Sequence, residues 1–309
     1  MRIVSLLPSA TEIVCDLGLD SQLCGISHEC DYPESVAGLP VLTSSAIDPK
    51  AMTPAEIDEA VSRAVSQGEP LYGVDTDLLN EIEPQLIVTQ GLCDVCAVSG
   101  ETVAKSLDLD MEPALRETKV VTLAATTVDG ILRDLQRVGA AAGIPAATSQ
   151  RAGYWRARWE ALRRRPRPGT TLRVIVLEWT DPAFLGGHWV PEMVEAAGGV
   201  HLLNPAGSRS KRCAWERIVS ADPDILIVAA CGYGLAENIE FALRLRREHP
   251  ELRAIADGQL WACDANSYFA RPAPRVIEGA ELLAQIVRGI DPPKGRAQRI
   301  RNEDFTRSP

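Results

Sequence analysis

The chain has 309 residues, a hydrophobic content of 46% and a formal net charge of −10. This length allows one large domain or two lobes of ordinary size. The acidic balance argues against a general nucleic-acid binder and against a protein that associates with anionic membranes. No apolar run is long enough to span a bilayer, so we expect no membrane insertion.

The start of the sequence and its cysteines predict a cellular location. Met1 and Arg2 lead directly into a predicted strand, without the apolar core and small-residue cleavage site of a signal peptide. Eight cysteines in a chain with ample core are typical of a reducing compartment rather than of a disulfide scaffold. We therefore predict a cytoplasmic protein. A periplasmic protein is the alternative if a leader has been removed.

Strands and helices alternate in the first part of the chain. Apolar β-type runs predict strands over residues 3–7, 23–27, 86–89 and 119–123. Two capping boxes, Ser9 with Glu12 and Thr53 with Glu56, predict that helices start at those points. This alternation is typical of an α/β lobe.

The middle of the chain is predicted to be helical. Apolar residues recur at helical spacing between Val128 and Arg165, and Gly143-Ile144-Pro145 interrupts them. The pattern therefore predicts one long helix or two helices end to end. It stops at residues 165–169, where successive prolines cannot continue a helix.

The second part of the chain repeats the pattern of the first. Residues 79–88 and residues 218–227 each combine a short amphipathic helix, an acidic-Pro turn and a buried β run, and a glycine follows each. Each half also opens on an arginine and a β run, at residues 2–6 and 173–177. The duplication predicts two Rossmann-like α/β lobes with a long helix between them, whose ligand-binding loops follow the carboxyl ends of the strands.

The expected boundaries follow from this pattern. Residues 1–126 form an N-terminal α/β lobe, 127–169 a connecting helical region and 170–290 a C-terminal α/β lobe. Residues 291–309 are basic, polar and rich in proline, and we expect a frayed tail there.

The ordered set of motifs resembles a known family. Residues 5–12, 25–27, 31–33 and 84–88 are similar to the first lobe of the cobalamin (vitamin B12) substrate-binding proteins of ABC transporters. Residues 184–187, 197–199, 223–227 and 271–275 resemble the second lobe of that family. The resemblance covers nearly the whole chain and implies the helical-backbone (class III) periplasmic-binding-protein fold, which also serves haem, siderophores and metal ions.

The resemblance also implies site residues and a partner. The expected ligand is cobalamin or a related corrinoid or tetrapyrrole, a flat ring that suits aromatic side chains and backbone amides. The family also presents an acidic residue from each lobe to the transporter permease, and here these are Asp77 and Glu216, each seven residues before a duplicated proline. The implied ligand contacts are Tyr32, Gly91, Leu92, Phe184, Tyr268, Phe269 and Arg271.

A cysteine cluster departs from the family pattern. Cys93 and Cys96 form a compact chelating pair, and His28 and Cys30 come from a neighbouring strand end. Three thiolates and an imidazole would suit zinc, and three or four thiolates an iron–sulfur cluster. Cys231 and His188 could join if the lobes close. Unligated cysteines that fill small loop positions are the competing interpretation.

Three functions remain open from the sequence. The first is a binding protein for a corrinoid that is retained in the cytoplasm, and the second is a metal or iron–sulfur protein on the same fold, an enzyme or a maturation factor. The third is a periplasmic protein that docks on a transporter, which requires that a signal peptide has been removed. No nucleophile elbow, phosphate-binding loop or dinucleotide motif is present, which favours binding over catalysis without deciding it.

Overall fold

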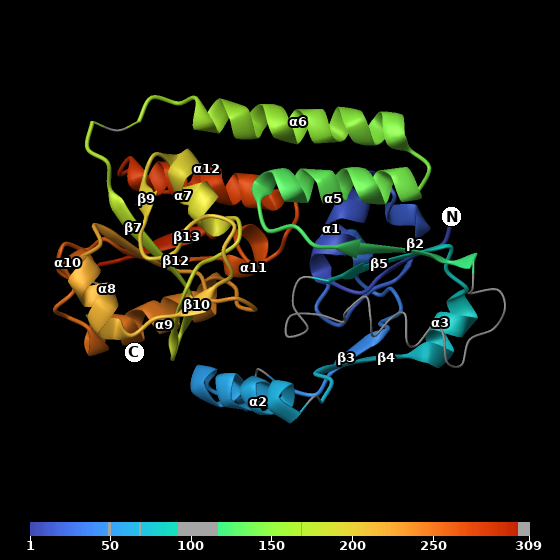
Figure 1. Ribbon diagram of the computed structural model, residues 1–309, viewed down its shortest axis with the longest axis horizontal. Coiled ribbons are helices and arrows are strands. Elements are labelled where there is room, and N and C mark those ends of the chain that lie inside the picture. Colours follow the sequence, from blue (N-terminus) through green and yellow to red (C-terminus); the bar gives the residue numbers. More distant parts are fainter. Residues whose placement is uncertain (49–50, 68, 92–116, 168, 302–309) are drawn as a thin grey trace. The chain divides into compact units, whose positions relative to one another are not determined.

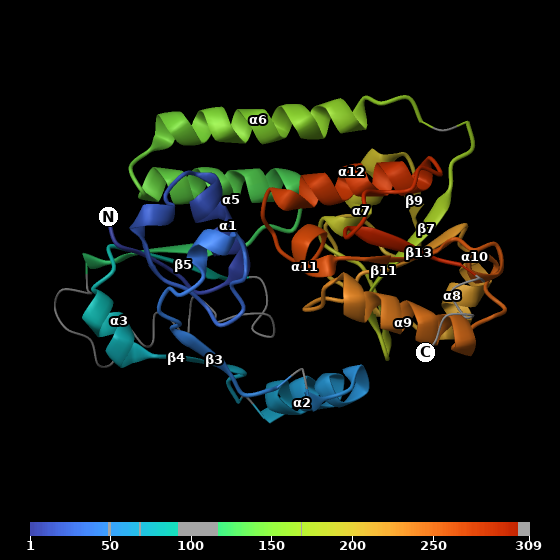
Figure 2. The same cartoon turned by 180° about the vertical axis from the view of Figure 1, so that it is seen from behind.

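The computed structural model describes residues 1–48, 51–67, 69–91, 117–167 and 169–301 (Figure 1). The chain forms two compact units. The first comprises Met1–Ala125 and Asp129–Tyr154, and the second Thr126–Val128 and Trp155–Pro309. Each unit is built on a sheet with helices around it, as Figure 2 shows from behind. The predicted α/β class is therefore confirmed.

The first unit contains a parallel four-stranded sheet in the order β2-β1-β5-β6. Every residue of the inner strand β5 is buried, because neighbouring strands and covering elements enclose it. A separate antiparallel pair, β3 and β4, follows β2 along the chain. The strands are β1 (Ile3–Ser5), β2 (Leu23–Gly25), β3 (Thr43–Ser45), β4 (Tyr72–Val74), β5 (Leu86–Gln90) and β6 (Lys119–Leu123).

The first helix starts earlier than its predicted capping box. Helix α1 is Pro8–Asp16, its N-cap is Leu7, and no side chain caps it. The prediction that Ser9 caps the helix is therefore wrong. Proline at the first helical position supplies the required backbone angle and needs no hydrogen-bond partner, so the helix begins at Pro8.

The second capping box is confirmed at α2 (Pro54–Gln67). The Thr53 amide donates to Glu56 Oε2 at 2.7 Å, and the Glu56 amide donates to Thr53 Oγ1 at 3.4 Å. The Thr53 amide and hydroxyl both donate to Glu56 Oε2, and these two bonds lower the pKa of the Glu56 carboxyl. The next helix, α3 (Thr76–Ile82), is capped by Asp75, which accepts from the Leu78 amide at 2.9 Å.

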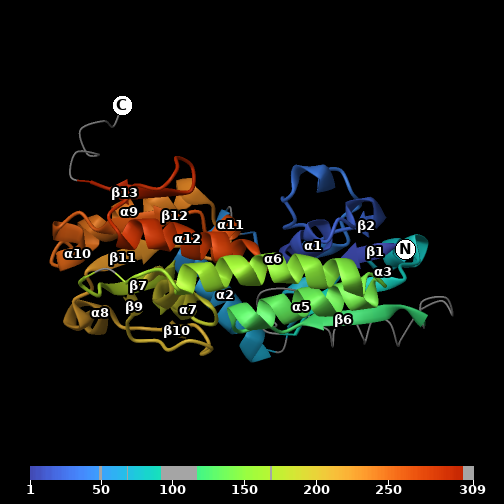
Figure 3. The same cartoon turned by 90° about the horizontal axis from the view of Figure 1, so that it is seen from above.

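The middle region consists of two helices, α5 (Val128–Ala141) and α6 (Pro145–Arg163). They lie side by side and do not continue end to end (Figures 1 and 3). The chain reverses direction at Gly143, which has a φ of +80°. A Cβ on Gly139 of α5 would overlap the side chain of Thr148 on α6, so this glycine permits the close approach of the two helices.

Helix α6 contributes to both units. In the first unit Arg151 forms a two-pronged ion pair with Asp16 of α1. In the second unit the Arg158 guanidinium lies 2.6 Å from Glu281 Oε2, on α12 (Arg275–Val287). The chain therefore passes from the first unit to the second within this helix, between Tyr154 and Trp155.

The second unit contains a seven-stranded sheet in the order β10-β8-β7-β11-β12-β13, with β9 also paired to β7. Strands β7, β9, β11 and β12 run parallel, whereas β8, β10 and β13 pair antiparallel. The strands are β7 (Arg173–Thr180), β8 (Ala183–Leu185), β9 (Val200–His201), β10 (Lys211–Arg212), β11 (Ile225–Val228), β12 (Leu260–Cys263) and β13 (Ala297–Ile300).

Strand β13 corrects one expectation. It lies inside residues 291–309, for which we expected a frayed tail, and it pairs with the whole of β12. Ala297 and Ile300 are buried against the sheet, and this burial explains why a polar segment is ordered.

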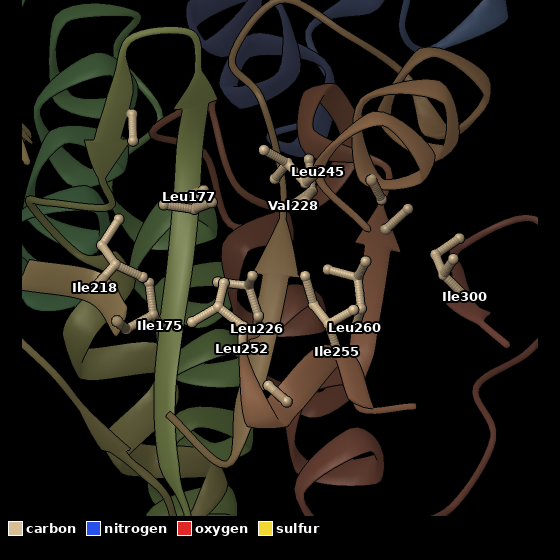
Figure 4. Close-up of a cluster of buried hydrophobic side chains, with 14 of the residues drawn as sticks. Ile175, Leu177, Ile218, Leu226, Val228, Leu245, Leu252, Ile255, Leu260 and Ile300 are labelled. Atoms are coloured by element: carbon tan, nitrogen blue, oxygen red, sulfur yellow. The ribbon is translucent and has the colours of Figure 1, made fainter. Parts of the chain in front are cut away.

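A single hydrophobic cluster lies beneath this sheet (Figure 4). It combines residues of the strands with residues of the helices that cover them, among them Ile175, Leu226, Leu245, Leu252 and Leu260. The helices that contribute residues to this cluster are α8 (Trp215–Ala221), α9 (Leu235–Glu248) and α10 (Arg253–Ala256). The other helices of the second unit are α7 (Val190–Ala197), α11 (Ala265–Tyr268) and α12.

The duplicated turn has the same conformation in both units. After α3, Glu83 adopts a left-handed conformation (φ 45°), and after α8 Asp222 does the same (φ 44°). In each unit an arginine at or just before the first strand binds the left-handed residue: an Arg2 guanidinium nitrogen donates to Glu83 Oε2 at 3.4 Å, and one of Arg173 donates to Asp222 Oδ2 at 3.1 Å. The repeat seen in the sequence is therefore a repeat in structure.

Candidate functional site

The carboxyl end of β7 in the second unit carries a row of aromatic and cationic side chains. Phe184 of β8 pairs with Trp179 of β7 on one side and with Arg212 of β10 on the other. Residues paired directly across antiparallel strands project from the same face of the sheet. The Arg212 guanidinium carbon lies 5.6 Å from the centre of the Phe184 ring. We call Trp179, Phe184 and Arg212 the aromatic ledge.

Further rings extend from the ledge to the loops after β11 and β12. The Tyr233 ring centre lies 5.8 Å from that of Trp179 and 5.0 Å from that of Phe241. Tyr268 ends α11, with the Arg296 guanidinium 5.3 Å from its ring centre. Burial raises the pKa of both tyrosine hydroxyls. These side chains offer flat apolar area and hydroxyls that remain protonated at neutral pH.

A carboxyl and an imidazole occur in the same segment of the chain, since Glu178 precedes Trp179 in β7 and His188 follows β8. Burial raises the pKa of Glu178 to about 7, although the Gly187 amide donates to its Oε2 at 3.3 Å. His188 has a φ of +53°, which two backbone bonds hold in place: its amide donates to Ser208, and its carbonyl accepts from Gly207. Burial and then the charge of Arg209 lower the pKa of the His188 imidazole.

The predicted contacts of the second unit divide into two groups. Phe184, Tyr268 and Arg271 are half-buried and retain surface for a ligand. Phe269 has an exposed fraction of only 3%, and its carbonyl accepts from Trp189 Nε1 at 2.8 Å. This burial indicates that Phe269 supports the site from within the core.

The predicted contacts of the first unit lie in loops after strands. Tyr32 follows β2 and is 46% exposed, before a cis bond to Pro33. Gly91 directly follows β5 and is exposed, and its amide donates to the Leu123 carbonyl at 2.8 Å. Leu92 lies outside the described residues.

The structure does not support a metal cluster. Cys93 and Cys96 lie outside the described residues. Among the residues that are described, no group of three or more His, Cys, Asp or Glu side chains is arranged to hold a metal ion. The Cys30 sulfur contacts hydroxyls instead, lying 3.0 Å from Thr11 Oγ1 and 3.2 Å from Ser27 Oγ.

The remaining members of the predicted cluster are also engaged elsewhere. His28 is exposed, and its Nδ1 lies 2.6 Å from Thr43 Oγ1. Cys231 and His188 belong to the second unit, whereas Cys30 and His28 belong to the first. The zinc and iron–sulfur predictions therefore have no support from the part of the chain that the structure describes.

The two acidic residues of the docking prediction occupy equivalent positions. Asp77 lies in the first turn of α3 and Glu216 in the first turn of α8, and both are exposed. Each is the second residue of its helix, and each helix leads into the duplicated turn. The spacing found in the sequence therefore corresponds to the same place in both units.

Trp179, Arg212 and Tyr233 were not among the predicted site residues. Trp179 ends a predicted strand, and Tyr233 lies in a predicted loop after a strand. Aromatic residues at the carboxyl ends of strands could therefore have been predicted as ligand contacts. Arg212 had no such signal, because only the pairing of β10 with β8 brings it to Phe184.

Comparison with curated proteins gives relatives along nearly the whole chain. The vitamin B12-binding protein of Yersinia pseudotuberculosis serotype O:3 is 22% identical over 294 residues, covering 94% of this chain and 88% of that protein. The protein of the same name from Vibrio cholerae is 22% identical over 284 residues, covering 91% and 87%. No protein-family model matches the chain.

Comparison with solved structures gives the same fold. The periplasmic vitamin B12 binding protein of Vibrio cholerae superposes with a TM-score of 0.68 at 19% identity, covering 93% of this chain and 96% of that one. A periplasmic haem-binding protein from Roseiflexus has a TM-score of 0.66 at 21% identity, covering 93% and 97%. The chain therefore has the helical-backbone (class III) periplasmic-binding-protein fold. Its resemblance to the cobalamin-binding family of that fold, first indicated by the motifs, is confirmed.

These comparisons overturn one prediction. The cytoplasmic location that we predicted from the first residues is contradicted, because proteins of this fold that match the chain are described as periplasmic. The point at which a sequence begins is no guide to a leader, and the thiols alone did not justify the prediction. As to the bilayer, none of the described helices combines the length and apolar character needed to cross it.

Proposed function

We propose that this chain is a substrate-binding protein for cobalamin or a related corrinoid. The observation that carries the proposal is the similarity to vitamin B12-binding proteins over 94% of the chain, which includes both units and their strand-end loops. By the same similarity, the protein delivers its ligand to an ABC transporter.

The chemistry of the second unit is suited to a corrinoid. A corrin ring is broad and flat, with amide side chains at its rim, and it needs apolar area together with a few polar groups that fix its orientation. Phe184, Tyr268 and Arg271 supply both kinds of group, beside the protonated hydroxyls of the row. In the first unit, we propose that Tyr32 and the backbone at Gly91 contribute.

We also keep the domain boundaries and the transporter contacts as proposals. Residues 1–126 and 170–290 are proposed as the two ligand-binding lobes, with 127–169 connecting them. Asp77 and Glu216 are proposed to meet basic side chains of a permease, because both are exposed at equivalent helix starts. Within the residues that the structure describes, no observation favours the metal or iron–sulfur alternative.

Replacing Phe184 with alanine tests the ligand site. Loss of a stacking ring should weaken cobalamin binding about ten- to a hundredfold, since one aromatic contact with its buried area is worth roughly 1.4–2.8 kcal/mol. Binding is measured by calorimetry, with circular dichroism as the check on folding. Tyr154→Ala is the matched control, because Tyr154 is an exposed aromatic on α6 and does not follow a strand. Equal affinity of wild type and Phe184→Ala would remove Phe184 from the site.

A further inference from the structure

The aromatic ledge carries a positive charge at its outer edge. Strand β10 is the last strand of the sheet on that side, and Arg212 is exposed there. Its guanidinium carbon lies 5.6 Å from the centre of the Phe184 ring, within the range of a cation–π contact. The contact orients the guanidinium beside the ring. The aromatic ledge therefore ends in the planar guanidinium of Arg212, which can donate hydrogen bonds.

The neighbouring residue on the same strand has the opposite orientation. Lys211 pairs with Leu185, a fully buried residue of the hydrophobic cluster, whereas Arg212 pairs with Phe184. Successive residues of a strand project to opposite faces, so Lys211 lies on the other side of the sheet edge from the ledge. Of the two adjacent cations, only Arg212 shares a face with the aromatic rings.

We propose that Arg212 recognises an anionic group on the ligand while Phe184 and Trp179 hold its flat ring. In cobalamin the anionic group is the phosphodiester that joins the nucleotide arm to the corrin. A guanidinium is well suited to this group, because it donates two parallel hydrogen bonds to phosphate oxygens and remains charged at all relevant pH values. The inference rests on the proposed function and goes beyond it, since it makes Arg212 the residue that distinguishes corrinoids with a phosphodiester from those without.

The test compares two corrinoids on three proteins. Cobinamide keeps the corrin ring and lacks the phosphodiester and nucleotide, so it serves as the ligand without the anionic group. The proteins are wild type, Arg212→Gln and the matched control Lys211→Gln, each titrated with cobalamin and with cobinamide by absorbance and calorimetry. Arg212→Lys is the fourth variant, which keeps the charge and loses the fork of donors.

Arg212→Gln should weaken cobalamin about five- to twentyfold and change cobinamide less than twofold, as expected for one exposed charge-assisted contact. Lys211→Gln should change neither ligand. Arg212→Lys should restore part of the preference for cobalamin, and this preference should decrease as salt is added.

Two results would overturn the inference while leaving the proposed function intact. One is equal loss of both ligands in Arg212→Gln, which would make the arginine a support for Phe184. The other is unchanged binding of both ligands in that variant. If wild type binds neither corrinoid, the proposed function itself fails, and the inference fails with it.

Discussion

Gly279→Ala should destabilise the second unit by about 2–3 kcal/mol, as expected for a side chain forced into a filled space. Gly279 is a buried residue of α12, and a Cβ there would overlap the carbonyl oxygen of Tyr268. Backbone atoms cannot yield as a flexible side chain can, so α11 must shift. The free energy of unfolding from denaturant titration measures the effect.

The same substitution should also weaken corrinoid binding. Tyr268, a proposed ligand contact, is the last residue of α11 and would be displaced when that helix shifts. Gly153→Ala is the matched control: Gly153 lies within α6, and a Cβ there meets nothing within 4 Å. This control should leave stability unchanged or raise it by up to about 1 kcal/mol, since alanine favours helix. A Gly279→Ala protein as stable as wild type would show that α11 and α12 are less closely packed than the structure has them.

Acid should destabilise the protein through His201, and His201→Gln should remove that sensitivity. His201 is 8% exposed, Val176 N donates to its Nε2 at 3.4 Å, and its Nδ1 lies 3.1 Å from the Asn204 carbonyl. The neutral imidazole satisfies both partners with the proton on Nδ1. Burial lowers the pKa of His201 from 6.5 to about 4, although the contacts with Asn204 and Val176 act in the opposite direction.

The lowered pKa fixes the direction of the effect. Between pH 6.5 and about 4 the unfolded chain binds a proton at this histidine and the folded chain does not, so stability falls as the pH falls through that window. The shift corresponds to roughly 3 kcal/mol. The free energy of unfolding, measured at pH 7.0, 5.5 and 4.0, should therefore decrease by about that much more in wild type than in His201→Gln.

Glu178 makes stability depend on pH in the opposite direction, so a variant of Glu178 is needed beside His201→Gln. Its raised pKa, about 7, means that the folded chain keeps a proton that the unfolded chain loses, so stability falls as the pH rises from 4.5 to 7. The two groups partly cancel in wild type. Glu178→Gln should reveal the acid sensitivity of His201, and His201→Gln should reveal the alkaline sensitivity of Glu178. Parallel pH curves for all three proteins would contradict both assignments.

Much of the fold follows from local sequence signals. Apolar β runs located β5 and β6 to within a residue, and the repeated acidic-Pro turn located the equivalent place in both units. These features depend on neighbours in the chain, such as Pro84 after Glu83 and Pro223 after Asp222 in the duplicated turn. The capping box at Thr53 was predictable for the same reason.

The features that the sequence missed depend on packing between distant segments. The reversal of α6 onto α5 requires Gly139 to face Thr148, and no local pattern expresses that contact. Strand β13 is polar and is ordered by its pairing with β12. Composition alone could not distinguish Phe269, which is buried, from Tyr268, which keeps exposed surface.

The site shows the same division. Phe184 was predictable from the family resemblance, whereas Arg212 reaches it only through the antiparallel pairing of β10. Cys30 illustrates the converse error: its position after a strand indicated a metal ligand, but its sulfur lies among the hydroxyls of Thr11 and Ser27. The position of a residue in the sequence predicted that it lies at the end of a strand. The pairing of the strands determined which side chains share a face of the sheet.

The measurement that tests the proposed function most directly is a spectral titration of the purified, anaerobically handled wild-type protein with cobalamin, with haem as the competing ligand and metal analysis of the same sample. We predict one cobalamin per chain, a shift of the corrin absorption bands, tighter binding than haem and no stoichiometric zinc or iron. Absence of any heat or spectral change with cobalamin, together with stoichiometric metal in the protein as isolated, would contradict the corrinoid assignment.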